Sequence, residues 1–188
     1  MPACRSPVGG SSGKVVKTMT MTEREFWTVL HGMVFGTVFL LAFTGGFACL
    51  WSLKRALITE PGIKERIKRL IIGMWTMAIT AWVTVVSGTY IVYPWYRAKD
   101  TGSPRSLLLA NPDTQAWHTF GMEWKEHVGW FAPILATAAA FIVTYYGTSL
   151  AENTRLRKSV LVLFTIAFAA SAVAGLFGAL LNKVAPIQ

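Results

Sequence analysis

Charged residues, cysteines and histidines are all scarce in this sequence. Only 14% of the 188 residues are charged, whereas 53% are hydrophobic, which is atypical of a soluble domain with a polar surface. The two cysteines lie in unlike contexts, Cys4 in a polar segment and Cys49 in an apolar one, so neither a disulfide framework nor a CxxC metal site is predicted. The chain also has no Walker loop, GxSxG motif or CxxCH haem-attachment motif. The sequence therefore favours a membrane protein over the common soluble enzyme classes.

Four apolar stretches are long enough to cross a bilayer as helices, which takes about 20 residues each. They cover about residues 26–51, 70–93, 127–150 and 160–181. The predicted fold is all-α, an integral membrane four-helix bundle over residues 23–182. A disordered tail is predicted at 1–22 and a short C-terminal tail at 183–188. No span carries an acidic residue or arginine near its middle, which argues against an ion or proton transporter.

Basic residues predict the orientation of the spans. The net charge of +9 is concentrated in the two short connections between the first and second spans and between the third and fourth. Such loops face the cytoplasm and meet lipid headgroups, so nucleic acid is not a predicted partner. The longer connection, about residues 94–126, has mixed charges and is predicted on the periplasmic side of a bacterial inner (cytoplasmic) membrane.

Three local patterns predict details of the helices. Asn111 followed by Pro112 predicts a helix start that runs on into the third span. Pro133 cannot donate to the Gly129 carbonyl and predicts a kink there. A polar stripe at helical spacing in the second span is predicted to face the bundle; it consists of Thr76, Thr80, Thr84, Ser87 and Tyr90.

The three histidines, His31, His118 and His127, all fall on the predicted periplasmic side although they come from separate stretches of sequence. His31 lies inside the first span and His127 at the start of the third, so two helices bring imidazoles to similar depth. His118 and His127 are nine residues apart, which places them on opposite faces of one continuous helix, separated by roughly 13 Å along its axis. His127 is the preferred partner for His31, because Glu123 one turn earlier can orient its ring.

This pair suits one b-type haem, which needs an axial donor on each face of its macrocycle. His31 and His127 are the predicted axial ligands, with His118 as an alternative. Gly32 and Gly36 offer a helix surface without side chains that a porphyrin can approach, although a tight helix–helix contact explains the same spacing. An ordinary interfacial role explains His31 and His127 equally well, and it explains His118 better than a ligand role does. A non-haem metal centre is not favoured, because the ExxH spacing is absent.

The arrangement of His31 and His127 resembles that of the small four-helix membrane cytochromes b, over about residues 23–182. Because this chain has only three histidines, it departs from the two-haem members, and the resemblance implies one haem at most. It further implies electron transfer between quinone, a further candidate ligand, and an extracytoplasmic partner such as a periplasmic cytochrome. Propionate partners would be Arg97, Arg105 or Lys125.

The predicted function is therefore that of a b-haem electron-transfer subunit of a respiratory or photosynthetic membrane complex, in contact with lipid and with the other subunits. A non-catalytic role within such an oxidoreductase complex is favoured over an enzyme active on its own. The alternative is a cofactor-free accessory subunit that scaffolds a membrane complex through its helix faces.

Overall fold

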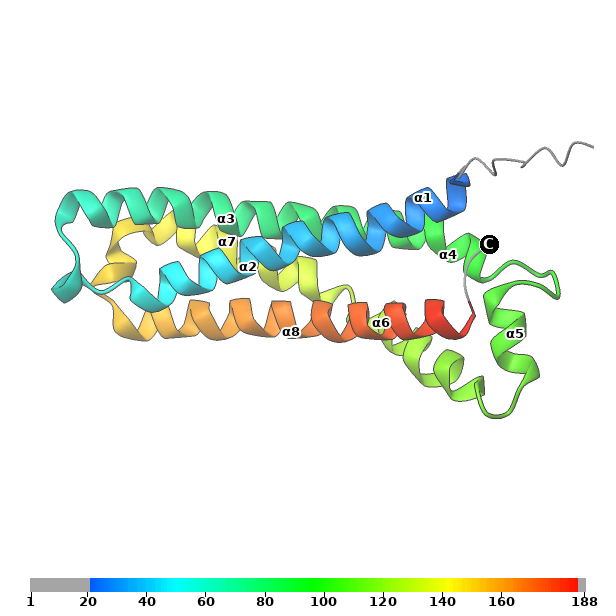
Figure 1. The fold of residues 1–188 in the computed structure, drawn as a ribbon. Coiled ribbons are helices and arrows are strands. Elements are labelled where there is room, and N and C mark those ends of the chain that lie inside the picture. The colour runs from blue at the N-terminus through cyan, green and yellow to red at the C-terminus, as the bar shows by residue number, and fades with distance from the viewer. Residues whose placement is uncertain (1–20, 186–188) are drawn as a thin grey trace, which may run out of the picture.

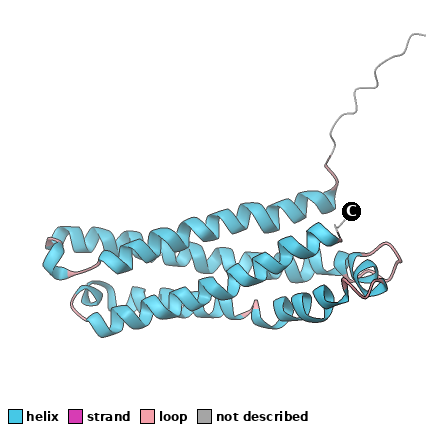
Figure 2. Cartoon of the chain, turned by 60° about the horizontal axis from the view of Figure 1, so that its bottom comes forward, coloured by secondary structure: helices cyan, strands magenta, loops and turns pink. Residues whose placement is uncertain are grey.

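The computed structural model describes residues 21–185, and most of these residues are helical, with no strand among them (Figures 1 and 2). The tail predicted at 1–22 lies outside the described residues except for Met21 and Thr22. The C-terminal tail predicted to begin at residue 183 starts too early, because the last helix continues to Val184. The all-α fold class is confirmed.

Four helical stretches of the described residues are long and apolar enough to cross a membrane, as the sequence predicted. They are Glu23–Ser52, Glu60–Tyr96, Trp117–Ala151 and Thr154–Val184. The first comprises α1 (Glu23–Val29), η1 (Leu30–Val34) and α2 (Phe35–Ser52), and the second comprises α3 (Glu60–Ser87), η3 (Gly88–Val92) and α4 (Tyr93–Tyr96). The third comprises η4 (Trp117–Met122), α6 (Glu123–Val128), α7 (Phe131–Tyr146) and η5 (Gly147–Ala151), and the fourth is the single helix α8 (Thr154–Val184).

The two ends of the bundle differ (Figure 1). At one end, called the hairpin end below, short connections join the first span to the second, through η2 (Arg55–Leu57), and the third to the fourth. At the other end, called the α5 end, the longer connection carries the helix α5 (Pro104–Ala110), and the first and last helices also reach this end. All three histidines belong to the half of the bundle nearest the α5 end.

Local signals in the sequence explain where the helices begin. Thr22 and Glu25 form a reciprocal capping box at the start of the first span. Asn153 caps α8 by accepting a hydrogen bond from the Leu156 amide. Between these two caps in the chain, α7 ends at Tyr146 and is followed by Gly147, whose φ of 48° is disfavoured for other residues. These caps fix the lengths of the helices that carry the candidate site.

The third span is interrupted, and it begins later than the sequence predicted. A break at residues 129–130 separates α6 from α7, as predicted from Pro133, and the Gly129 carbonyl accepts from the Ala132 amide instead. The predicted helix start at Asn111 is wrong. The Asn111 side chain accepts from the Asp113 amide and closes a turn, because asparagine hydrogen-bonds its local backbone as readily as it caps a helix.

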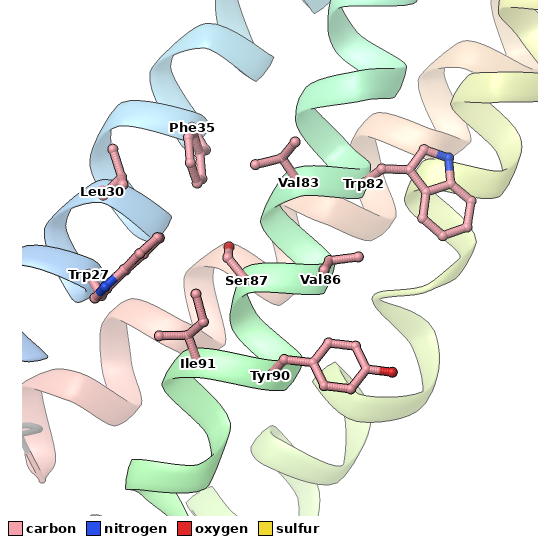
Figure 3. A pocket seen from close by; sticks show the side chains of 9 residues that line it. All are labelled: Trp27, Leu30, Phe35, Trp82, Val83, Val86, Ser87, Tyr90 and Ile91. Atoms are coloured by element: carbon pink, nitrogen blue, oxygen red, sulfur yellow. The ribbon is translucent and has the colours of Figure 1, made fainter.

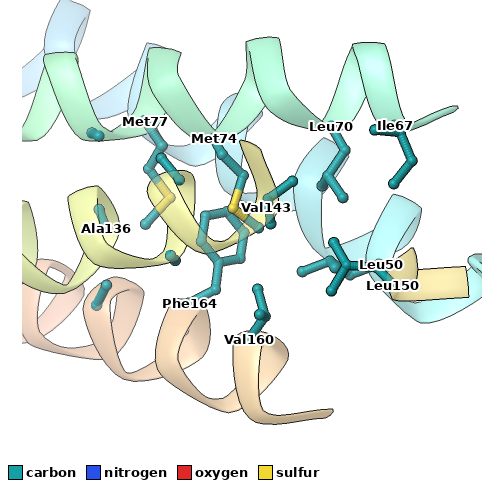
Figure 4. Packing of buried hydrophobic residues seen from close by; sticks show 14 of the residues in the cluster. Leu50, Ile67, Leu70, Met74, Met77, Ala136, Val143, Leu150, Val160 and Phe164 are labelled. Atoms are coloured by element: carbon teal, nitrogen blue, oxygen red, sulfur yellow. The ribbon is translucent and has the colours of Figure 1, made fainter. Parts of the chain in front are cut away.

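The main hydrophobic core lies towards the hairpin end, where all four spans meet (Figure 4). Phe164 of α8 is fully buried at its centre, against Met74 and Val143 of the second and third spans. A Cβ atom on Gly46 would lie 2.9 Å from the Phe164 ring, so a glycine in the first span makes room for this ring. Many large apolar side chains on the outer faces are exposed, as expected for helices surrounded by lipid.

Candidate functional site

His31 joins the first span to the second. Its ring is half-buried, and Nδ1 lies 3.2 Å from the Ser87 hydroxyl oxygen. The ring lies against the backbone of Gly88, where a Cβ atom would be only 2.7 Å from His31 Cε1. Any side chain at position 88 would therefore displace the imidazole. The sequence analysis did not predict that Ser87 is the hydrogen-bond partner of His31, or that position 88 requires glycine. It did predict, from the polar stripe, that Ser87 faces the bundle.

The hydrogen bonds of Ser87 indicate which nitrogen of His31 carries the proton. The Ser87 hydroxyl donates to the Thr84 carbonyl at 3.1 Å, so its oxygen accepts from His31 Nδ1–H. In the neutral imidazole this leaves the lone pair of Nε2 as the acceptor or ligand atom. Histidines that bind metals commonly donate the N–H of the other ring nitrogen in a hydrogen bond of this kind.

His127 has the same tautomer but lies elsewhere. Its Nδ1 is 2.7 Å from the Glu123 carbonyl oxygen, which only accepts, so Nδ1 donates and Nε2 keeps its lone pair. Glu123 therefore orients the ring, as predicted, but through its backbone rather than its carboxylate. His127 is exposed. Both histidines therefore keep the Nε2 lone pair, but His31 packs between two spans whereas His127 is exposed.

Lys125 is directed towards another helix, unlike the exposed His127. Its ammonium group reaches α8, where a Cβ atom on Gly178 would lie 2.8 Å from Nζ. Lys125 and His127 are two residues apart on α6, so they point about 200° apart around the helix. No described carboxylate lies within ion-pair distance of Lys125. The lysine charge thus lies against another helix and forms no ion pair among the described residues.

His118 forms a second cluster, closer to the α5 end. It is buried, and its Nδ1 lies 2.8 Å from the Tyr96 hydroxyl. The surrounding apolar cluster includes Leu108 of α5 and Leu181 of α8. Arg105 acts electrostatically on both His118 and Tyr96, and its Nε is buried without a hydrogen-bond partner among the described residues. An unsatisfied buried donor of this kind commonly marks the place of a water or an anion.

Arg97 is already neutralised, unlike Lys125 and Arg105. It forms ion pairs with Glu123 at 3.1 Å and Glu126 at 3.2 Å, and its guanidinium lies 5.0 Å from the centre of the Tyr93 ring. Desolvation acts to lower the pKa of Arg97, but Glu126, Tyr93 and Glu123 raise it overall. These contacts fasten the end of the second span to α6.

Three π-helical turns occur in this half of the bundle, and each carries a residue of the candidate site. His31 lies in η1, Gly88 begins η3, and His118 lies in η4. A π turn widens the helix locally and is found often at functional sites. The turn at η3 also explains a wrong prediction. Tyr90 leaves the polar stripe and is 72% exposed, because a π turn advances fewer degrees per residue than an α turn.

The predicted glycine surface faces outward. Gly32 and Gly36 are exposed, and a Cβ atom on either would meet nothing within 4 Å. The alternative of a tight helix contact at these glycines is therefore wrong within the described chain. The space beside them stays open, and their predicted role next to a porphyrin stays a prediction.

The described residues define an α-helical membrane bundle with a polar site in one half. No group of three or more histidine, cysteine, aspartate or glutamate side chains among them is placed to hold a metal ion. Comparison of the chain with models of known protein families, with curated proteins and with solved structures finds no match. The argument for a function accordingly depends on the residues of the site.

Proposed function

We propose that this chain is a membrane-anchored b-haem electron-transfer subunit of a bacterial respiratory or photosynthetic complex. It passes electrons between quinone and an extracytoplasmic redox partner, such as a periplasmic cytochrome. The observation that carries the proposal is the His31 imidazole, which Ser87 holds through Nδ1 between two apolar spans so that Nε2 keeps its lone pair. The Lys125 ammonium, in the third span, has no described carboxylate within ion-pair distance.

The His31 imidazole and the Lys125 ammonium both favour a ligand that combines a metal with negative charge. Charged groups within a span are costly unless they are paired or reach water, so the Lys125 ammonium favours an anionic partner. The Nε2 lone pair of His31 favours a metal or a hydrogen-bond donor. A b haem supplies iron, two carboxylates and a one-electron couple in a single group.

The roles of the site residues follow from their contacts. His31 provides one axial ligand, oriented by Ser87. His127 stays the predicted second ligand and His118 the alternative; His127 would have to turn towards the bundle, which the break at 129–130 permits because α6 is not continuous with α7. Lys125 and Arg105 are the propionate partners, whereas Arg97 is occupied by its two glutamates.

The density of basic residues at the hairpin end supports a cytoplasmic location for that end. The α5 end, with the site, would then face the periplasm of a bacterial inner membrane. An electron carrier on that side would be within reach of the α5 helix, and the exposed apolar faces leave room for lipid and for other subunits.

The test is a reduced-minus-oxidised visible spectrum of protein purified from haem-sufficient cells. We expect a b-type α band in the wild type that is lost, or shifted to high spin, in both His31→Ala and His127→Ala. His118→Ala is the matched control and should leave the band unchanged. Retention of the band in His127→Ala with loss in His118→Ala would reassign the second ligand. A folded wild type without a Soret band would refute the proposal.

A second candidate is the cofactor-free accessory subunit. The observation that favours it is that His31 already packs between two spans, with its ring against Gly88, while His127 points away. In that case the same complex should assemble with His31→Gln, which can keep the hydrogen bond to Ser87. Capture of identical partner subunits by wild type and His31→Gln, with no haem in either, would establish this function.

A further inference from the structure

A groove between the first two spans exposes only apolar atoms, so nothing in its lining selects a polar ligand (Figure 3). A second groove, near the start of α8, combines charge with apolar surface. Its volume is about 430 Å³, within the range of small-molecule sites, which is roughly 300–1,000 Å³. Its lining residues all belong to α8: Arg155, Lys158, Ser159, Val162, Leu163 and Ile166.

The charged and apolar residues of this groove are ordered along the helix axis. Lys158, Val162 and Ile166 follow one another at four-residue spacing, so they form one stripe on the surface of α8. Arg155 begins the neighbouring stripe, which continues to Leu163. Each stripe therefore starts with a basic residue at the hairpin end and becomes apolar towards the middle of the span, over roughly 12 Å. A phospholipid has the same order of groups, a charged headgroup followed by acyl chains.

The two basic residues of the groove lack a carboxylate partner. The three described carboxylates of the hairpin end are engaged elsewhere, because Arg55 pairs with two of them and Arg69 with the third. Arg155 and Lys158 are exposed and form no ion pair among the described residues. They are three residues apart on one helix, so their charges are neighbours and repel each other. An anion bound between them would remove that repulsion.

The basic pair and the apolar stripe together select the ligand. A phosphate ion would meet Arg155 and Lys158 but would leave the apolar stripe without a partner. A zwitterionic phospholipid would cover the stripe, but its own ammonium group competes for its phosphate. A phospholipid with net negative charge gains from both parts of the groove, through attraction to the basic pair and through burial of an acyl chain.

We propose that the groove on α8 holds one acidic phospholipid, with its phosphate between Arg155 and Lys158 and an acyl chain along Val162 and Ile166. The apolar stems of the two basic side chains let their charged ends reach the level of the headgroup. The inference goes beyond the proposed function and does not depend on haem, because the groove lies at the hairpin end and the histidines lie in the other half of the bundle.

The test is native mass spectrometry of the full chain in detergent micelles, titrated with phosphatidylglycerol. We expect one phosphatidylglycerol to bind per chain with saturation, about tenfold more tightly than phosphatidylcholine with the same acyl chains. Inorganic phosphate and glycerophosphoglycerol are the anions without acyl chains. Both should bind at least about tenfold more weakly than phosphatidylglycerol, because they bury no apolar surface.

Two double variants remove equal charge from two places at the hairpin end. Arg155→Gln with Lys158→Gln neutralises the groove, whereas Lys64→Gln with Lys68→Gln removes two exposed lysines of α3. The first pair should weaken phosphatidylglycerol binding about 10- to 30-fold, the contribution of two basic residues near a lipid surface. The second pair should match the wild type. All four residues are exposed, so circular dichroism should show the same helix content in both variants.

A second matched pair tests the apolar part of the groove. Val162→Trp fills the groove, whereas Val173→Trp places the same ring at an exposed position of α8 outside it. Val162→Trp should weaken phosphatidylglycerol binding at least about fivefold, because the added ring occupies the path of the acyl chain. Val173→Trp should match the wild type.

Each other outcome would overturn the inference. Equal weakening by the two glutamine pairs would mean that the basic end attracts acidic lipids without a defined site. Equal affinity for phosphatidylglycerol and phosphatidylcholine would mean that the groove does not select charge. Tight binding of inorganic phosphate that persists in Val162→Trp would assign the basic pair to a free anion. A dimer seen by light scattering that only Val162→Trp dissociates would assign this face of α8 to a second copy of the chain.

Discussion

Replacing Gly88 by alanine tests whether the His31 ring is positioned as the structure shows. The added Cβ atom would lie 2.7 Å from His31 Cε1 and 3.4 Å from Nε2. Carbon atoms are in favourable contact at about 3.5–4.0 Å, so the ring or the second span must shift by close to 1 Å. Either movement lengthens the 3.2 Å hydrogen bond between His31 and Ser87.

The expected cost has two parts. Overpacking of a well-filled site costs about 1–3 kcal/mol, and loss of the hydrogen bond adds about 0.5–1.5 kcal/mol. Alanine is about 1 kcal/mol more favourable than glycine within a helix, which offsets some of this. We therefore expect Gly88→Ala to lower the free energy of unfolding by about 1–3 kcal/mol.

Gly36→Ala is the matched control, because its Cβ atom would meet nothing within 4 Å. Unfolding in mixed micelles, followed by helical circular dichroism, gives the difference between the two variants. We expect Gly36→Ala to be neutral or slightly stabilising. Equal stability of the two variants would contradict the placement of His31 against Gly88. Where haem is bound, Gly88→Ala should also broaden or shift the α band.

Three further substitutions test other parts of the structure by the same unfolding measurement. Phe164→Ala should lower the free energy of unfolding by about 3–5 kcal/mol, because the ring is fully buried. Phe141 is 59% exposed, so Phe141→Ala should lower it far less. Similar losses in the two variants would mean that the core is misplaced. Tyr96→Phe removes the hydroxyl that is hydrogen-bonded to His118 and should lower the free energy of unfolding by about 0.5–1.5 kcal/mol. An unchanged stability would mean that His118 has another partner. Arg157→Lys should lower the free energy of unfolding by about 1–3 kcal/mol, because one ammonium cannot replace a buried guanidinium that donates to two backbone carbonyls. An unchanged stability of this variant would argue against that contact.

The membrane fold was predictable because length and hydropathy of single segments are enough to identify a span. Each helix nevertheless extends beyond the predicted limits, and the second begins at Glu60 rather than near residue 70. Its first turns are charged, yet Ile63 and Ile67 are buried on the bundle side. A hydropathy criterion averages over both faces of a helix, so it misses an amphipathic extension beyond the hydrocarbon region.

The site was predictable only in part, because its contacts depend on rotation between helices. The sequence drew attention to His31 and Ser87 for separate reasons, and the structure joins them by a hydrogen bond. No pattern in the sequence indicates that the imidazole of His31 packs against Gly88, or that the ammonium group of Lys125 packs against Gly178. Glycine is needed at these two positions because a side chain of another helix approaches there, and periodicity within one segment cannot predict such a contact.

The π turn η4 explains why His118 and Lys125 point in different directions. Were η4 and α6 one regular α-helix, His118 and Lys125, seven residues apart, would lie within about 20° of the same face. The wider turn of η4 removes that alignment, so His118 pairs with Tyr96 at the α5 end while Lys125 enters the bundle. His127 follows Lys125 by about 200° and is turned outward. A change in the length of this π turn would rotate Lys125 and His127 together about the axis of α6.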